Sequence, residues 1–254
     1  MEIEEVEFLR TEKWEEGGLI DHGFGTRGGG GKKVLKKDWW GRRLNEKGGI
    51  LPLVSIRQVH GDRVVVFNGK MEEIPELWNQ EGDALITRVP GFALSVFTAD
   101  CLPILLFDPT QRVVGIVHAG WKGTSKRILQ NAIGKMKEVF NCRGENIQAA
   151  MGPCIGPCCL EVDDPVKKAF GAGGLPWEII SSRRQKGKWL LDLYKANAYL
   201  LEIEGVHREN VQRLESCTRC RRDIFYSYRG EEETQGRQLN FIALRKADQP
   251  SDPG

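Results

Sequence analysis

Charge excess, long apolar runs and an export signal are all missing from this chain. In its 254 residues, 37 lysines and arginines nearly balance 35 aspartates and glutamates, and the net charge is +2. No long basic face occurs, so nucleic acid is not an expected partner. The longest apolar stretch, residues 92–107, is interrupted by Asp100 and Pro103 and is too short to cross a bilayer as a helix. The amino terminus lacks the basic and apolar regions of a secretory signal, so we expect a soluble, cytoplasmic protein with no membrane partner.

An even set of cysteines is also missing. The seven thiols, in a chain without an export signal, fit reduced cysteines or metal ligands better than a disulfide scaffold. Cys217-Thr218-Arg219-Cys220 has the spacing of half a zinc knuckle or of a redox pair, and Cys158-Cys159 could complete a four-thiol site. No second Cys-x-x-Cys supports that site, so buried reduced cysteine is the default interpretation. The seven are Cys101, Cys142, Cys154, Cys158, Cys159, Cys217 and Cys220.

No repeat or linker divides the sequence, which predicts one domain over residues 1–246 and a polar tail at 247–254. Short β-rich runs, several of them apolar on every residue, predict strands buried on both faces at 53–56, 64–67, 84–87, 93–98, 104–107 and 113–117. Apolar residues at three- and four-residue spacing predict helices at 124–140 and 193–203, and late strands follow at 225–228 and 239–244. The class is therefore α/β or α+β with a mixed sheet. Four glycines at 28–31 predict a mobile loop that could close over a ligand.

Chemistry-bearing residues stand at three predicted strand ends. Only four histidines exist, and two of them, His60 and His118, lie next to or near a glycine at a strand end, where side chains are presented rather than packed. Cys101 follows a third strand, directly after Asp100. Two imidazoles and a thiolate are ligands that Zn²⁺ accepts, with the fourth position left for a water that ionises near neutral pH. Copper is also chemically admissible with these ligands. Asp100 could orient a histidine or act as a base, although neighbours on a strand point to opposite faces.

Several motifs occur in the order seen in the YfiH-type, laccase-domain family, and the resemblance runs from about residue 22 to residue 244. The family is associated with phosphorolysis of adenosine, inosine and methylthioadenosine to base and sugar 1-phosphate, with deamination of adenosine, and with copper-dependent oxidation of polyphenols. The motifs are Gln58-Val59-His60-Gly61, Gly82-Asp83-Ala84-Leu85, Ala99-Asp100-Cys101-Leu102-Pro103, His118-Ala119-Gly120-Trp121-Lys122-Gly123, Gly152-Pro153-Cys154-Ile155-Gly156-Pro157-Cys158-Cys159 and Leu191-Asp192-Leu193.

The resemblance implies a fold, a metal site and substrates. His60, Cys101 and His118 fall on the family's metal triad, whose usual ion is zinc. The implied fold is a single-domain, layered α/β/β/α arrangement with mixed sheets, distantly similar to bacterial toxin cysteine hydrolases with a catalytic Cys/His pair. The implied partners are purine nucleosides and phosphate, and a monomer is the default expectation for the oligomeric state.

A phosphate co-substrate requires positive charge and hydrogen-bond donors. Arg27 lies on a recurring family segment beside the predicted glycine loop and is the preferred phosphate candidate. Arg57 precedes the first metal motif, and Lys122 stands at the start of a predicted helix, whose N–H groups attract anions. Each cation taken alone is also explained as a solvated surface residue. Trp121 could stack on a purine or pack in the core.

Other functions remain open at this point. A metal-free thiol hydrolase would use Cys101 as nucleophile and His118 as base, which leaves His60 without a role. Editing of cytoplasmic peptidoglycan precursors is a further alternative that the resemblance raises. The usual zinc deaminase signature is absent, so deamination would use a different scaffold. Four histidines are too few for a multicopper cluster, which disfavours true multicopper oxidation.

Overall fold

The computed structural model describes residues 8–27, 43–46, 49–231 and 236–246. The glycine loop predicted at 28–31 and the polar tail predicted at 247–254 lie outside these residues. Within the described part, no helix is both long and apolar enough to cross a membrane.

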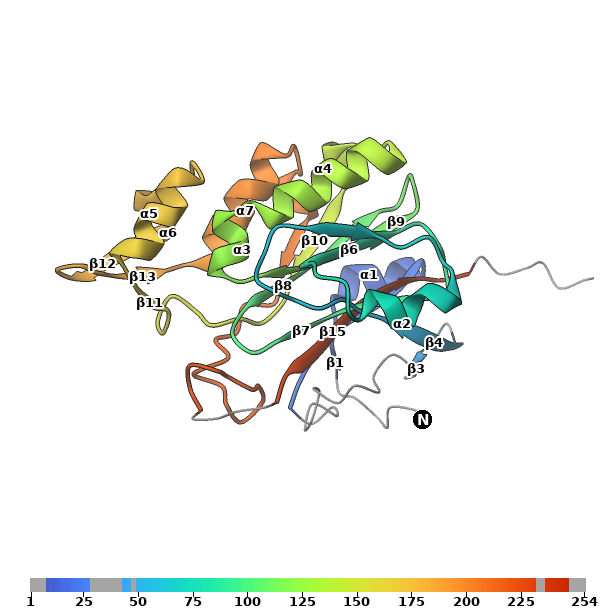
Figure 1. Cartoon of the computed structure of the whole chain (residues 1–254), viewed down its shortest axis with the longest axis horizontal. Coiled ribbons are helices and arrows are strands. Elements are labelled where there is room, and N and C mark those ends of the chain that lie inside the picture. The colour runs from blue at the N-terminus through green and yellow to red at the C-terminus, as the bar shows by residue number, and fades with distance from the viewer. Residues whose placement is uncertain (1–7, 28–42, 47–48, 232–235, 247–254) are drawn as a thin grey trace, which may run out of the picture.

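Two six-stranded sheets form the body of the protein (Figure 1). Parallel pairs (β4 with β7, β5 with β6, and β10 with β14) occur beside antiparallel ones, so both sheets are mixed, as predicted. The first sheet has the order β1 (Phe8–Leu9), β2 (Ile20–Gly25), β15 (Gln238–Leu244), β7 (Ala93–Thr98), β4 (Gly49–Val54) and β3 (Arg43–Glu46). The second has the order β14 (Val211–Arg213), β10 (Gln148–Met151), β8 (Leu102–Asp108), β9 (Val113–Ala119), β6 (Ala84–Thr87) and β5 (Val64–Val66).

The central strands β8 and β9 show why apolar runs predicted strands here. Both are buried along their whole length and pair in antiparallel register from Leu102–Ala119 onward. Side chains alternate between the faces of a strand. Ile104 therefore packs in the core under the helices, whereas its neighbour Leu105 packs in the core between the two sheets. A strand covered on both faces needs apolar residues at every position.

Helices cover the outer face of the second sheet, with α4 (Ile128–Phe140) and α7 (Leu193–Ile203) side by side in Figure 1. The predicted helix 193–203 is confirmed. The continuous helix predicted at 124–140 is wrong, because α3 (Trp121–Ser125) ends before α4 begins. Arg127 separates them with a left-handed φ of 65°, and its Nε donates to the Gly173 carbonyl at 2.7 Å.

A third sheet, of three strands, lies at one end of the molecule, next to α3 (Figure 1). It has the order β11 (Glu161–Asp163), β13 (Lys188–Leu191) and β12 (Ser181–Gln185), with helices α5 (Asp164–Ala172) and α6 (Trp177–Ile180) beside it. Short helices α1 (Glu12–Gly17) and α2 (Ile74–Leu77) bury Trp14, Ile74 and Leu77 in the core between the two large sheets. Single 3₁₀ turns occur at Met71–Glu73, Gly144–Asn146 and Arg208–Asn210.

The strand predicted at 225–228 is wrong, whereas the one predicted at 239–244 forms most of β15. Turn hydrogen bonds and side chains, not a neighbouring strand, satisfy the backbone of residues 225–228. The Phe225 N–H donates to the Arg221 carbonyl at 2.9 Å. The Phe225 carbonyl accepts from the Arg27 guanidinium, and the Tyr226 carbonyl accepts from the Gln238 amide. These bonds hold the segment as an irregular turn.

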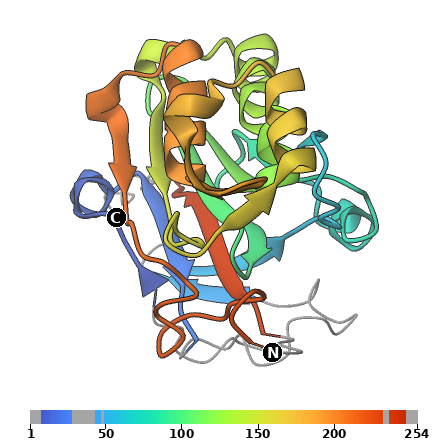
Figure 2. The same ribbon diagram turned by 90° about the vertical axis from the view of Figure 1, so that its left-hand side faces the viewer.

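The layers stack in the order helix, sheet, sheet, and Figure 2 shows the layer that contains α4 and α7 above the two large sheets. One apolar core fills the space between α4, α7 and the second sheet, and another lies between the two sheets. A smaller cluster around Leu53 and Phe241 lies on the outer face of the first sheet. The predicted single-domain, mixed α/β class is confirmed. The ends of β4, β7 and β9 meet at one edge of this stack, where the site is found.

Candidate metal centre and its pocket

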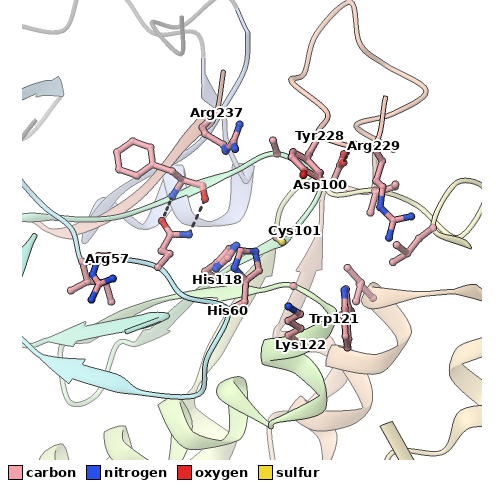
Figure 3. Close-up of a pocket in the computed structure, with 18 of the residues that line it drawn as sticks. Arg57, His60, Asp100, Cys101, His118, Trp121, Lys122, Tyr228, Arg229 and Arg237 are labelled. Atoms are coloured by element: carbon pink, nitrogen blue, oxygen red, sulfur yellow. Dashed lines mark hydrogen bonds between the residues drawn. The ribbon is translucent and has the colours of Figure 1, made fainter. Parts of the chain in front are cut away.

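The two histidines and the cysteine predicted as ligands converge. His60 lies in the loop after β4, Cys101 in the turn between β7 and β8, and His118 near the end of β9. Their ligand atoms all lie within 4.8 Å of one another, and Figure 3 shows the two rings beneath the Cys101 sulfur. Zinc bond lengths imply nitrogen–sulfur separations of about 3.5 Å in a tetrahedron. Small side-chain adjustments therefore bring all three atoms onto one ion.

Asp83, at the start of β6, holds both histidines. Its carboxylate is fully buried, and Oδ1 accepts from His118 Nδ1 at 2.8 Å and from the His60 backbone N–H at 3.0 Å. Oδ2 accepts from the N–H groups of Val59 at 3.2 Å and Gly61 at 2.6 Å. Because an ionised carboxylate only accepts, Nδ1 of His118 carries the proton and Nε2 is left for a metal. Burial opposes ionisation of Asp83, but the hydrogen bonds from His118 and the backbone hold its pKa below the ordinary value.

The chain around the triad is unusual at three positions, two in their backbone conformation and one in its close packing. His60 and Asp100 adopt left-handed φ values of 58° and 89°, which non-glycine residues keep only where surrounding contacts hold them. The Asp83 bonds hold His60, and Gln58 exchanges two hydrogen bonds with the Phe97 backbone, at 2.9 and 2.8 Å (Figure 3). At Gly120, a Cβ atom would lie 2.6 Å from the Cys101 sulfur. Glycine is therefore required there for the thiol to fit.

The thiol and the imidazole change each other's protonation. Burial raises the pKa of Cys101, but His118 and His60 outweigh it and lower the pKa to about 6. Burial lowers the pKa of His118, while Cys101 and Asp83 raise it to about 9. Between these values the metal-free site holds a thiolate beside an imidazolium. A thiolate is the form that binds metal or acts as a nucleophile.

A pocket of about 1250 Å³ opens over the triad. Its wall includes four aromatic side chains, those of Trp78, Phe97, Trp121 and Tyr228, and four cations, Arg57, Lys122, Arg229 and Arg237. The cations surround the triad from several sides in Figure 3. Among the described residues that line the pocket, Asp100 is the only one with a carboxylate. Both of its carboxylate oxygens accept hydrogen bonds, from Thr218 Oγ1 at 2.6 Å and from the Arg229 backbone N–H at 2.7 Å. The pocket therefore combines aromatic and cationic lining residues and is net positive.

The family model described as multi-copper polyphenol oxidoreductase laccase matches residues 41–245, most of the chain. The chain belongs to this family. A protein of Bacteroides thetaiotaomicron named purine nucleoside phosphorylase is 36% identical over 165 residues, which are 65% of this chain and 61% of that protein. A protein named adenosine deaminase RL5, from an unknown prokaryotic organism, is 36% identical over 200 residues, which are 75% of this chain and 74% of that protein.

The fold of a solved structure agrees with this one. The crystal structure of Bacillus licheniformis hypothetical protein YfiH superposes with a TM-score of 0.81 at 25% sequence identity. The superposition covers 95% of this chain and 97% of the YfiH chain. The resemblance predicted from the motifs is thus confirmed at the level of family and fold. The roles of individual residues remain predictions.

The structure places three of the four predicted substrate-binding residues, Arg57, Trp121 and Lys122, in the pocket wall. Arg27, the preferred phosphate candidate, is not among the described lining residues. Its guanidinium forms an ion pair with Glu231 and lies 4.3 Å from the centre of the Tyr226 ring. Asp100 lines the pocket but anchors Thr218 and Arg229, and the carboxylate that orients His118 is Asp83.

Sequence reasoning did not select Asp83, Tyr228, Arg229 or Arg237 as site residues. One feature of the sequence could have identified Asp83. It lies in the motif Gly82-Asp83-Ala84-Leu85, directly before the apolar residues that begin β6. Tyr228 ends the segment that was predicted to be a strand, and Arg229 directly follows it in an irregular turn. Their approach to the triad depends on hydrogen bonds between segments far apart in the sequence, which no local pattern reports.

Proposed function

We propose that the chain is a metal-dependent purine nucleoside phosphorylase that acts on adenosine, inosine and methylthioadenosine, and that it also deaminates adenosine at the same site. The observation that carries the proposal is a net-positive, aromatic-walled pocket directly over a His₂Cys triad. Such a pocket suits two substrates at once, a planar purine and an anion. The names of the relatives point to the same chemistry.

The triad fits a zinc ion by its donor chemistry. His60, Cys101 and His118 supply two imidazole nitrogens and a thiolate, and His118 presents Nε2 because Asp83 occupies Nδ1. Three protein ligands leave one position free toward the pocket. When bound there, the ion supplies a Lewis acid that lowers the pKa of water toward neutrality. Copper is compatible with the same donors, but the chain's four histidines are too few for a multicopper cluster.

In phosphorolysis a phosphate oxygen forms a bond to C1′ of the sugar while the bond between C1′ and the purine nitrogen breaks. The electron pair goes to the purine, which then takes a proton. The guanidinium groups of Arg57 and Arg237 and the ammonium of Lys122 would hold phosphate for this attack. Trp121 would stack against the base, which also excludes water from the reacting carbon.

Deamination of adenosine is the second candidate, favoured by the relative named adenosine deaminase RL5. Water would add at C6 of the purine, and ammonia would leave. The base would then lie with C6, in place of C1′, near the triad. One pocket accommodates both poses only if its aromatic walls hold the purine in two orientations.

The test is chromatography of adenosine incubated with zinc-loaded enzyme, with and without phosphate. We expect adenine only when phosphate is present, and slow formation of inosine in both cases. Adenine release without phosphate would show hydrolysis and contradict the proposal. Arg57→Gln and Arg237→Gln should raise KM for phosphate at least about tenfold each, because each removes a charged donor.

Metal content distinguishes this proposal from a Cys101–His118 thiol hydrolase. His60→Ala, Cys101→Ala and His118→Ala should each lose the triad's zinc and the phosphorolysis together. His207→Ala is the matched control, since His207 is an exposed histidine that interacts with Glu209 at 3.6 Å. Full activity in metal-stripped enzyme would reject the metal mechanism in favour of the thiol one.

A further inference from the structure

Four cysteines outside the triad bring their sulfur atoms together. Two belong to the turn between β10 and β11, and two belong to the turn that follows β14. All four sulfurs lie within 4.8 Å of one another. The Cys220 sulfur is 3.7 Å from that of Cys158 and 3.5 Å from that of Cys159. We refer to Cys158, Cys159, Cys217 and Cys220 as the four-thiol cluster.

These separations match a tetrathiolate metal site. A zinc–sulfur bond of about 2.3 Å gives sulfur–sulfur edges of about 3.8 Å in a tetrahedron. A disulfide would require about 2.05 Å between two sulfurs and would leave the other two without a partner. In the cluster one sulfur, that of Cys220, lies at nearly equal distances from two others. That arrangement is expected around a common central ion.

The local backbone explains how adjacent cysteines reach one point. Cys159 N–H and Leu160 N–H both donate to the Gly156 carbonyl, at 2.9 and 3.0 Å, so residues 156–160 form a turn. In an extended strand, Cys158 and Cys159 would point to opposite faces. In a turn, successive side chains diverge less. Both thiols can therefore face the Cys217–Cys220 turn.

The two turns are also fitted closely to each other. Gly156 N–H donates to the Cys217 sulfur at 3.2 Å, the kind of bond that stabilises a thiolate. A Cβ at Gly156 would lie 3.2 Å from Cys217 Cβ and 3.3 Å from the Cys158 sulfur. Backbone bonds on either side of the contact, Cys154 N–H to the Ser216 carbonyl at 3.3 Å and Thr218 N–H to the Cys154 carbonyl at 3.0 Å, fix the register. The fold thus presents the four sulfurs without requiring a covalent link.

Charge and access suit a dianionic site. Zinc with four thiolates carries a net charge of −2, and the adjoining segment carries Arg219, Arg221 and Arg222, of which Arg221 also pairs with Asp223 at 3.1 Å. Cys158 and Cys220 are exposed, so an ion enters directly from solvent.

We propose that the four-thiol cluster binds a second Zn²⁺ with a closed, structural coordination shell. Four protein ligands leave no open position, so this ion does no chemistry. It ties the turn at 156–160 to the segment that carries Thr218 and Arg229. Those two residues hold both oxygens of Asp100, next to Cys101. The second ion therefore braces one wall of the pocket without touching the substrate.

Metal counting on the purified full chain tests the proposal. Wild-type protein, reduced and loaded with zinc, should hold two zinc ions per chain by elemental mass spectrometry after removal of free metal. Cys158→Ser and Cys220→Ser should each hold one, and His60→Ala should retain the other one. Cys142→Ala is the matched control, because Cys142 belongs to neither group of ligands, and it should hold two.

Cobalt provides a readout on wild-type protein that does not depend on any variant folding. Co²⁺ bound to four thiolates shows stronger sulfur-to-metal charge-transfer absorption than Co²⁺ bound to one thiolate and two imidazoles. We expect the tetrathiolate spectrum in wild type and in His60→Ala, and its loss in Cys220→Ser. One zinc per wild-type chain that is lost in His60→Ala, or a Cys220 disulfide recovered by peptide mapping from protein purified with its metal, would overturn the proposal. Either result would leave the triad and the phosphorylase activity untouched.

Discussion

Replacing Asp83 by asparagine should weaken metal binding at the triad without removing a ligand. The carboxylate accepts four hydrogen bonds, one from the His118 ring and three from backbone N–H groups around His60. Asparagine has one oxygen and one NH₂ group. Either orientation of the amide places a donor against N–H donors, so about two of these bonds are lost. The ring of His118 and the left-handed loop at His60 then lose their restraint.

The expected size follows from the type of contact. Loss of a partner that orients a metal-binding histidine costs about 10- to 100-fold in metal affinity, which corresponds to about 1.4–2.7 kcal/mol. The assay titrates stripped protein with zinc in competition with a chromophoric chelator, and circular dichroism checks that the variant is folded. Glu81→Gln is the matched control, because Glu81 forms an exposed ion pair with Arg57 and should change zinc affinity less than about twofold. Unchanged zinc affinity in folded Asp83→Asn would refute the positioning role.

Two further changes test other parts of the structure. Gly120→Ala should lower zinc affinity at the triad at least about tenfold, because its Cβ would meet the Cys101 sulfur at 2.6 Å. The control is Gly134→Ala in α4, whose Cβ meets nothing within 4 Å and which should leave the zinc affinity unchanged. Equal zinc affinities in the two variants would contradict the packing argument. His22 is buried, and burial followed by Arg10 lowers its pKa to about 4. The unfolded chain therefore takes up this proton first as pH falls, and the folded protein should lose about 3 kcal/mol of stability between pH 6.5 and pH 4. Urea unfolding should show a smaller loss in His22→Gln, and parallel pH profiles for the two proteins would disprove the assignment.

The pattern of apolar residues predicted the strands and helices whose buried side chains recur at regular intervals. Strands β8 and β9 are apolar at nearly every position because helices cover one face and the first sheet covers the other. Helix α7 has its apolar stripe because one side of it lies in the core that it shares with α4 and the second sheet. The prediction was wrong where individual hydrogen bonds, and not the spacing of apolar residues, decide the backbone conformation. Arg127 breaks the predicted helix through a bond to Gly173, and turn hydrogen bonds together with side-chain contacts hold residues 225–228 out of a sheet.

The sequence by itself determined the chemistry available to this protein: two histidines and a cysteine at strand ends, in motifs that place the chain in its family. Residue type and local spacing are properties of the chain alone, so they can be read without a structure. Only the tertiary structure decided which side chains meet. Asp83 reaches two histidines, Arg27 pairs with Glu231 and is not among the described residues that line the pocket, and four cysteines gather although only two have a recognised spacing. Each of these contacts joins segments far apart in the sequence, and their distance is set by the packing of the sheets and turns.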